Sequence, residues 1–208
     1  MSGKSPGNLI IVTAPSGAGK TTLVARMIER IDKVRPSISY TARPVRPGER
    51  DGRDYHFINR EEFLKMIERN EFLEWAEVHG NLYGTNIRAV EDARHQGYDV
   101  VATIDVQGAA LARKLYPEAI GVFILPPTRE ALESRLETRG SETNESRRLR
   151  LQNARHELAH ADQFDYIVIN EDLEQATEEL VAIVRAERCR TKHRNDFVRD
   201  LAKEFADF

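Results

Sequence analysis

An apolar segment, a glycine-containing loop and a helix start follow one another near the beginning of the chain. This succession constrains the fold more than any other feature. Residues 9–14 form a continuous apolar run, typical of a strand that is buried on both faces. A helical pattern begins at residue 20 and extends to residue 31. The loop between them reads Ala14-Pro15-Ser16-Gly17-Ala18-Gly19-Lys20-Thr21-Thr22. Because backbone amides and a helix dipole converge in such a loop, the sequence predicts an anion-binding site.

The residues at the end of this loop indicate which anion it binds. A lysine followed by a threonine is the pattern of a phosphate loop, in which Lys20 reaches the β- and γ-phosphates of a nucleotide and the Thr21 hydroxyl binds Mg²⁺. Ala14 stands where the general pattern has glycine. An ordinary tight turn is the alternative interpretation, but the flanking strand and helix patterns favour the phosphate loop. The sequence therefore predicts a site for ATP.

Further alternation of strands and helices defines the expected core. Three more apolar runs predict strands at residues 100–104, 120–125 and 166–169, and helical patterns occupy residues 109–116, 129–138 and 173–190. This order predicts an α/β fold in which helices flank a mostly parallel sheet.

Two stretches interrupt the alternation, within what we expect to be a single domain. Short β-like pieces at residues 37–40, 55–58 and 73–78 surround one helix, for which Asn59 and Glu62 supply a capping pattern. We expect an inserted lobe over residues 37–91, a polar helical lid over residues 126–161 and a helical tail over residues 191–208. The expected core consists of residues 8–36, 92–125 and 162–190.

The composition of the 208-residue chain limits its partners and its compartment. A net charge of −3 gives no general attraction to nucleic acid or to an anionic membrane. The single cysteine, Cys189, allows no internal disulfide, which is typical of a reducing compartment. No apolar run approaches the roughly 18 residues of a membrane span. We expect a cytoplasmic protein that contacts neither nucleic acid nor membrane.

From about residue 8 to residue 184 the chain resembles the guanylate kinase family. The resemblance rests on a series of segments in order: Ser39-Tyr40-Thr41-Ala42-Arg43-Pro44-Val45-Arg46-Pro47-Gly48-Glu49, Gly52-Arg53-Asp54-Tyr55-His56-Phe57, Glu71-Phe72-Leu73-Glu74-Trp75-Ala76, Gly80-Asn81-Leu82-Tyr83-Gly84-Thr85, Ile104-Asp105-Val106-Gln107-Gly108, Arg139-Gly140-Ser141-Glu142-Thr143 and Asn170-Glu171-Asp172-Leu173. The resemblance implies a P-loop core with a GMP-binding lobe and a lid. It also implies Mg²⁺- and ATP-dependent phosphorylation of GMP, and of dGMP.

By this resemblance the lobe holds the acceptor nucleotide. Its phosphate would bind Arg43, Arg46, Tyr55 and Tyr83, and its base would bind Ser39 and Glu74, with Thr85 and Asp105 alongside. A carboxylate such as Glu74 suits guanine, because guanine presents two donors on one edge. Adenine would leave the same carboxylate without partners, and a polar site rejects such a ligand strongly.

The resemblance also assigns the arginines of the lid and a residue after the last strand. Arg135, Arg139 and Arg150 would bind the ATP phosphates and the phosphoryl group in transfer, and Asn170 would lie near the adenine. Phosphoryl transfer needs alignment, charge neutralisation and exclusion of water more than covalent help. The expected catalytic set is therefore Lys20, Arg43, Arg139 and Arg150, with no catalytic base.

Three features stand apart from this assignment. The family usually has aspartate where this chain has Thr103, so Thr103 receives no metal role. Residues 156–160 read His-Glu-Leu-Ala-His, a zinc-protease pattern that we reject because a family helix is expected there. Phe197, Leu201 and Phe205 recur every four residues in the tail, which would dock on the body or on a second copy of the chain. The alternative functions are a same-fold kinase with another phosphorylated acceptor and a non-catalytic phosphopeptide-binding module.

Overall fold

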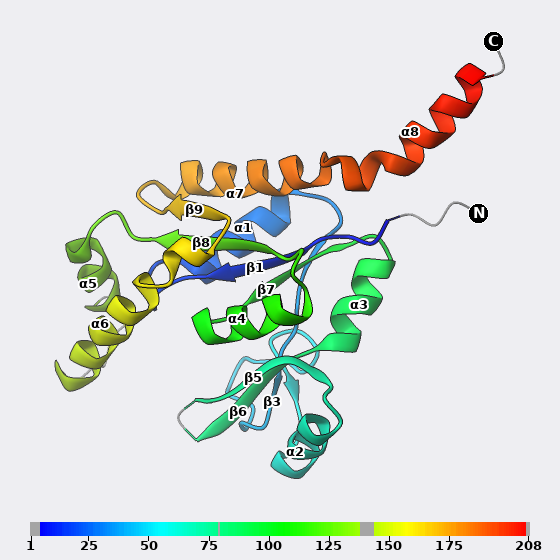
Figure 1. Ribbon diagram of the computed structural model, residues 1–208. Coiled ribbons are helices and arrows are strands. Elements are labelled where there is room, and N and C mark those ends of the chain that lie inside the picture. Colours follow the sequence, from blue (N-terminus) through cyan, green and yellow to red (C-terminus); the bar gives the residue numbers. More distant parts are fainter. Residues whose placement is uncertain (1–4, 79, 138–143, 207–208) are drawn as a thin grey trace.

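A five-stranded parallel sheet forms the core of the computed structural model, which describes residues 5–78, 80–137 and 144–206 (Figure 1). Its strand order is β2-β7-β1-β8-β9. The strands are β1 (Leu9–Thr13), β2 (Val34–Pro36), β7 (Asp99–Thr103), β8 (Ile120–Leu125) and β9 (Tyr166–Ile169). All five residues of β1 are buried, which is expected for a central strand covered on both faces. The parallel α/β core predicted from the sequence is confirmed.

Helices cover both faces of this sheet (Figure 1). On one face, Ile10 and Val12 of β1 pack against α1 (Lys20–Arg30) and α7 (Leu173–Arg188). On the other face, Leu9 and Ile11 pack against α3 (Ile87–His95) and α4 (Val106–Leu115). Alternate residues of one strand therefore supply two separate cores, as the two-residue period of a strand requires.

A smaller four-stranded sheet of order β4-β3-β6-β5 lies beyond α3 and α4 (Figure 1). Its strands are β3 (Tyr40–Thr41), β4 (His56–Phe57), β5 (Phe72–Val78) and β6 (Asn81–Asn86), and its helix is α2 (Arg60–Glu68). Phe63 of α2 stacks on Phe72 of β5 with ring centroids 4.5 Å apart. This lobe therefore has a hydrophobic core of its own.

The helix start predicted in the lobe is confirmed in part. The Asn59 side chain accepts a hydrogen bond of 2.8 Å from the backbone N–H of Glu62, so Asn59 caps α2. The Glu62 carboxylate pairs with Arg69 at 2.7 Å instead of completing a reciprocal cap.

The strands expected at residues 9–14, 100–104, 120–125 and 166–169 are confirmed as β1, β7, β8 and β9. Strands β2 and β6 and helix α3 had no sequence prediction, and the expected lobe boundary at residue 91 falls within α3. The sequence does not predict a strand at β6, because Gly84 is a residue typical of turns. A Cβ at Gly84 would lie 2.8 Å from a Phe72 ring atom and 3.1 Å from the Glu74 carbonyl, so close packing requires the glycine.

Two helices lie beside the carboxyl edge of the main sheet, and one extends from the body (Figure 1). Helix α5 (Arg129–Glu137) buries Leu132 and Leu136 against Ala154 of α6 (Asn144–Leu158). A short 3₁₀ turn, η1 (Ala161–Gln163), follows α6. Helix α8 (Thr191–Ala206) buries none of its residues and leaves Phe197 and Phe205 about 70% exposed.

Within the ranges that the structure describes, no helix has the length and apolarity to cross a bilayer.

Candidate active site

The loop after β1 has the backbone conformation that its glycines permit. Gly17 and Gly19 have φ values of 93° and 98°, in the left-handed region that favours glycine. A Cβ at Gly17 would meet the side chain of Leu136 at 2.9 Å, and one at Gly19 would meet Asn170 at 2.2 Å. Ala14 is 6% exposed and its methyl group belongs to the core, so the loop accommodates alanine at that place.

Two side chains from outside the loop stabilise its backbone with hydrogen bonds. The Asn170 side-chain amide donates a 2.7 Å hydrogen bond to the carbonyl of Ala18. Arg135 donates to the same carbonyl at 3.4 Å and to the carbonyl of Asn170 at 2.8 Å. Both residues were predicted to contact ATP, and in the structure they contact the loop itself. Ala18 and Asn170 are buried, whereas Thr21 and Thr22 are exposed on α1.

A cavity of about 270 Å³ opens in front of the loop. Its lining consists of Ala14, Pro15, Ser16, Gly17, Gly19, Lys20, Thr21, Asp105 and Glu157. The Lys20 ammonium donates to the Ile104 carbonyl at 3.4 Å. Burial lowers the pKa of Lys20, and the negative charges of Glu157 and Asp105 oppose that shift. We call this space the phosphate-loop cavity.

A second cavity, of about 200 Å³, lies on the lobe side, and we call it the acceptor cavity. Its lining consists of Ser39, Tyr55, Glu74, Ala76, Tyr83, Gly84, Thr103, Ile104 and Asp105. Asp105 lines both cavities, so the two spaces adjoin. Residues from the lobe and from the end of β7 meet there although they are far apart in the sequence.

Glu74 is the buried carboxylate of the acceptor cavity. It is 9% exposed and lies opposite Thr85, itself 1% exposed, in the β5–β6 register. Burial raises the pKa of Glu74, and the nearby charge of Asp105 raises it further. A Cβ at Gly108 would lie 3.2 Å from the Glu74 side chain, so the first turn of α4 packs closely on it. The carboxylate is thus fixed in place between the lobe and the core.

Two phenol rings lie beside this carboxylate. The rings of Tyr55 and Tyr83 have centroids 5.9 Å apart, and the Arg43 guanidinium lies 5.5 Å from the Tyr55 ring. Burial raises the pKa of Tyr55, so its hydroxyl stays protonated and can donate a hydrogen bond. Two hydroxyls and an arginine beside one cavity can bind an oxyanion.

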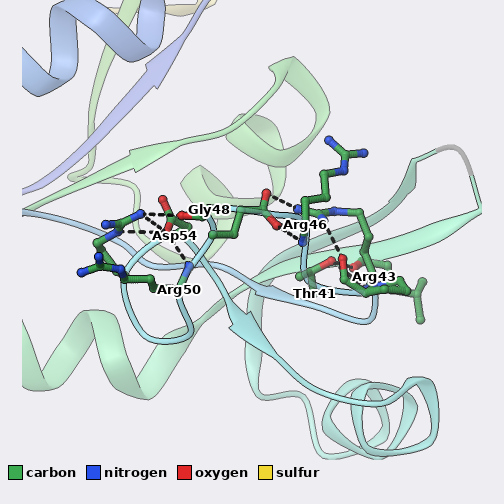
Figure 2. Close-up of polar contacts among 10 residues, drawn as sticks. Thr41, Arg43, Arg46, Gly48, Arg50 and Asp54 are labelled. Atoms are coloured by element: carbon green, nitrogen blue, oxygen red, sulfur yellow. Dashed lines mark hydrogen bonds and ion pairs between the residues drawn. The ribbon is translucent and has the colours of Figure 1, made fainter.

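Arg43 is itself held by a carboxylate of the following loop (Figure 2). Glu49 accepts from both terminal nitrogens of Arg43, at 3.0 and 2.7 Å, and from the backbone N–H of Arg46 at 2.8 Å. This pairing raises the pKa of Arg43, which is 7% exposed. The buried Nε of Arg43 has no hydrogen-bond partner among the described residues. The Arg46 side chain is exposed. Neither arginine lines the acceptor cavity.

The residues that link the core to the cavities follow β7. Asp105 caps α4, where its side chain accepts from the Gly108 N–H at 2.7 Å. Thr103 is exposed at the end of β7 and lines the acceptor cavity but not the phosphate-loop cavity. The carboxyl edge of a parallel sheet is where α/β proteins bind their ligands.

Besides Arg135, a second predicted arginine of the lid reaches the loop. Arg150 of α6 donates to the Ser16 hydroxyl at 3.3 Å. Arg139, which we expected in the catalytic set, lies outside the described residues.

Two carboxylates of the site were not assigned from the sequence. Glu49 was part of a quoted motif, but its position six residues after Arg43 does not reveal a bidentate contact. In the sequence, Glu157 belongs to no pattern except the rejected zinc-protease pattern. No group of three potential metal-ligating His, Cys, Asp or Glu side chains occurs in the described part of the chain. Because α6 lies far along the sequence from the phosphate loop, no local signal places Glu157 beside Lys20.

The fold and these cavities define a P-loop nucleotide-binding protein with a second cavity next to the first. A family model described as guanylate kinase matches residues 6–187. The chain is 51% identical to a guanylate kinase of Aromatoleum aromaticum over 191 residues, which covers 92% of this chain and 94% of the relative. It is 48% identical to a guanylate kinase of Thermotoga maritima over 190 residues, covering 91% and 92%.

A solved structure agrees with these sequence relatives. The guanylate kinase of Anaplasma phagocytophilum superposes with a TM-score of 0.73 at 34% identity, over 90% of this chain and 89% of that one. The chain belongs to the guanylate kinase family. It is accordingly an enzyme of the nucleoside monophosphate kinase class.

Proposed function

We propose that the phosphate-loop cavity binds ATP, that the acceptor cavity binds GMP, and that the enzyme transfers the terminal phosphoryl group between them to form ADP and GDP. The observation that carries this proposal is the shared wall at Asp105, which makes the cavities neighbours. Donor and acceptor phosphates must lie in line and close together for transfer. Two adjoining anion sites meet that requirement.

On the donor side, backbone amides of residues 14–21 would bind the ATP phosphates. Lys20 would neutralise the charge that develops on the transferred group, a contribution that becomes large when closure of the lid excludes water. Asn170 and Arg135 support this role indirectly, since they hold the Ala18 carbonyl and so keep the loop in shape. Contact of either side chain with ATP remains a prediction.

On the acceptor side, Glu74 and Ser39 would bind the guanine base, and Tyr55, Tyr83, Arg43 and Arg46 would bind its phosphate. The Arg43–Glu49 pair supports this assignment, because a bidentate partner fixes the guanidinium plane. The Nε edge is buried and without a partner among the described residues, so a small shift of the side chain would let it donate to a phosphate oxygen. Such fixed donors also bind dGMP, since the sugar 2′-hydroxyl is not needed for these contacts.

The donor set of the phosphate-loop cavity fits Mg²⁺ brought in by ATP. The cavity walls present the Thr21 hydroxyl and the carboxylates of Asp105 and Glu157. Mg²⁺ prefers oxygen ligands and keeps several waters, with one or two carboxylates and substrate phosphates completing its shell. When bound, the ion neutralises phosphate charge. The Thr21 hydroxyl is the group of this chain that would ligate it directly.

The lid arginines would complete the charge neutralisation. Arg150 already contacts Ser16 of the loop, so a phosphate bound there comes within its reach. We propose the same role for Arg139. Closure of residues 126–161 over the phosphates would exclude water, which protects ATP from hydrolysis.

The division into core, lobe and lid is part of the same proposal, with residues 37–91 as the lobe and residues 191–208 as a tail. We place the enzyme in the cytoplasm, where its substrates are, without nucleic-acid or membrane partners. Self-association through the exposed apolar residues of α8 is a further prediction, and sedimentation of the enzyme against an α8 double variant, F197S/F205S, tests it.

A coupled assay for ADP release tests the function. ATP is offered with GMP, dGMP, AMP, UMP, CMP or dTMP in turn. We expect turnover with GMP and dGMP and at most traces with the others. Preference for another nucleotide would favour a same-fold kinase of different specificity. No turnover with any of them, with binding of phosphopeptides, would favour the binding module.

A further inference from the structure

We propose that Glu157 is a positioning residue for the Mg²⁺ of bound ATP, acting on the water shell of the ion from the lid side of the phosphate-loop cavity. The proposal rests on the proposed ATP site and extends it to a residue to which neither the sequence motifs nor the family resemblance gave a role.

Glu157 reaches the cavity from an element separate from the loop. It lies in the last turns of α6, whereas Lys20 and Thr21 begin α1, and all three line the same cavity. Its side chain is partly buried. Helix α6 is attached to α5 through Leu132, Leu136 and Ala154, so the carboxylate is carried by a packed helical pair.

The Glu157 carboxylate has no hydrogen bond or ion pair with any residue that the structure describes. The charged groups that act on it are the Lys20 ammonium and the Asp105 carboxylate. A partly buried carboxylate loses part of its hydration, and without a hydrogen-bond or ion-pair partner little offsets that free-energy cost. A residue of this kind in an anion site needs an explanation.

Two carboxylates facing an ATP site would repel the phosphates if no cation lay between them. Asp105 and Glu157 are the acidic side chains in the lining of this cavity, and Lys20 is its ammonium group. A hydrated Mg²⁺ reverses the sign of the effect, because its waters donate to carboxylates while the ion binds phosphate oxygens. The arrangement therefore favours nucleotide with Mg²⁺ over nucleotide without it.

The departure at Thr103 fits this assignment. The family usually has an aspartate at that place, and this chain has a neutral hydroxyl that lines the acceptor cavity and not the phosphate-loop cavity. Glu157 of α6 supplies a second carboxylate to the cavity that Thr21 lines. Without it, Asp105 would be the one carboxylate in that lining available to the waters of the ion.

The zinc-protease pattern does not compete for Glu157. His156 and His160 lie one helical turn apart with ring centroids separated by 4.8 Å, and Nδ1 of His160 lies 2.9 Å from the His156 carbonyl. Glu157 is about 100° further around the helix, toward the phosphate loop.

The test measures binding of a fluorescent ADP with Mg²⁺ and with EDTA, in the full-length enzyme and in E157Q. We expect E157Q to bind ADP about 10-fold more weakly with Mg²⁺, as changes around a metal's outer shell commonly do. In EDTA its affinity should equal or exceed that of the parent. E157D, which keeps the charge, should recover most of the Mg²⁺ effect. D162N, an exposed change just beyond α6, is the matched control and should bind as the parent does.

Equal changes in affinity with and without Mg²⁺ would overturn the proposal, because Glu157 would then act only as a counter-ion for Lys20. No change in either condition would overturn it as well. Thermal unfolding of each variant separates these outcomes from loss of fold, and E157A, which also removes the charge, replaces E157Q if that variant misfolds. This experiment uses no acceptor, so its failure is distinct from failure of the parent enzyme to phosphorylate GMP.

Discussion

The phosphate-loop cavity and the acceptor cavity adjoin, yet they are built from different materials. The first is lined mainly by the loop between β1 and α1 and by the first two residues of α1, and Asn170 and Arg135 support that loop. The second is lined by residues of β5 and β6 of the small sheet, by Ser39 and Tyr55 from the loops before β3 and β4, and by the end of β7 with the two residues after it. Arg43, which lies near this cavity without lining it, is held by an ion pair with Glu49 within the lobe.

This difference indicates how the two sites recognise their ligands. Backbone amides at a helix start bind any phosphate and do not distinguish bases. Side chains such as Glu74 distinguish bases, but their positions depend on packing of the lobe against the core. Substitutions in the first site should therefore impair catalysis with every acceptor, and substitutions in the second should impair the use of GMP selectively.

The largest effect is expected at Lys20. K20A removes the charge that we propose neutralises the transferred phosphoryl, so kcat should fall by at least about 10²–10³-fold with GMP and with dGMP alike. Steady-state kinetics measure this, with circular dichroism to confirm the fold. K114A, an exposed change on α4, is the control. Retention of more than a tenth of the parental kcat would contradict the role of Lys20.

Glu74 should separate the two sites most clearly. E74A removes both proposed hydrogen-bond contacts to guanine, and each charge-assisted hydrogen bond is worth about 1.5–3 kcal/mol. We expect kcat/KM for GMP to fall about 100-fold or more while the KM for ATP changes little. If E74A phosphorylated GMP as well as the parent does, guanine recognition would lie elsewhere.

Arg43 should affect GMP binding to a smaller extent. R43A loses one charge-assisted phosphate contact of about 1.5–3 kcal/mol, which corresponds to about a 10- to 150-fold rise in the KM for GMP. It also leaves Glu49 without its partner, so R43K is a useful second variant because it keeps the charge and loses the fork. R53A, in the same loop but 55% exposed, should leave the KM unchanged. An unaltered KM in R43A would show that the phosphate binds elsewhere.

Asn170 tests whether the phosphate loop depends on its support. N170A removes the 2.7 Å hydrogen bond to Ala18 and should cost about 1–3 kcal/mol in the free energy of unfolding, because a buried carbonyl loses its main partner. The KM should rise equally for ATP and for other nucleoside triphosphate donors. A rise for ATP alone would instead show that Asn170 contacts adenine.

The smallest effect concerns the pH dependence set by Glu74. Burial raises the pKa of Glu74 in the folded protein. At pH values between the unfolded and the folded pKa, the folded state therefore keeps a proton that the unfolded state has released. Stability from this group is therefore present below the unfolded pKa and declines as the pH rises through the folded one. E74Q should raise Tm at neutral pH by a few degrees and lose that advantage near pH 4. Thermal unfolding at several pH values measures this, and a gain in Tm that is independent of pH would refute it.

The same raised pKa has a kinetic consequence of opposite direction. Protonated Glu74 cannot accept both guanine donors, so kcat/KM for GMP should fall as the pH drops through a value above that of an ordinary glutamate. This acid limb should vanish in E74Q.

The sequence by itself determined the parallel core, the phosphate loop and the family, because these depend on local patterns. Apolar runs specify buried strands, and a glycine-lysine-threonine loop needs only its neighbours in the chain. Ordered motifs likewise pointed to part of the lining of the acceptor cavity, namely Ser39, Tyr55, Glu74, Tyr83 and Asp105, whereas Arg43, Arg46 and Thr85 do not line it. The capping of α2 by Asn59 could be predicted for the same reason, since it spans three residues.

Only the tertiary structure decided which distant groups meet. Position 84 of β6 requires glycine because Phe72 and Glu74 of the neighbouring strand leave no room for a Cβ there. Glu49 engages Arg43, Asn170 and Arg135 support Ala18, and Glu157 enters the cavity of Lys20. These contacts arise from the packing of separate elements, whose relative orientation no local pattern encodes.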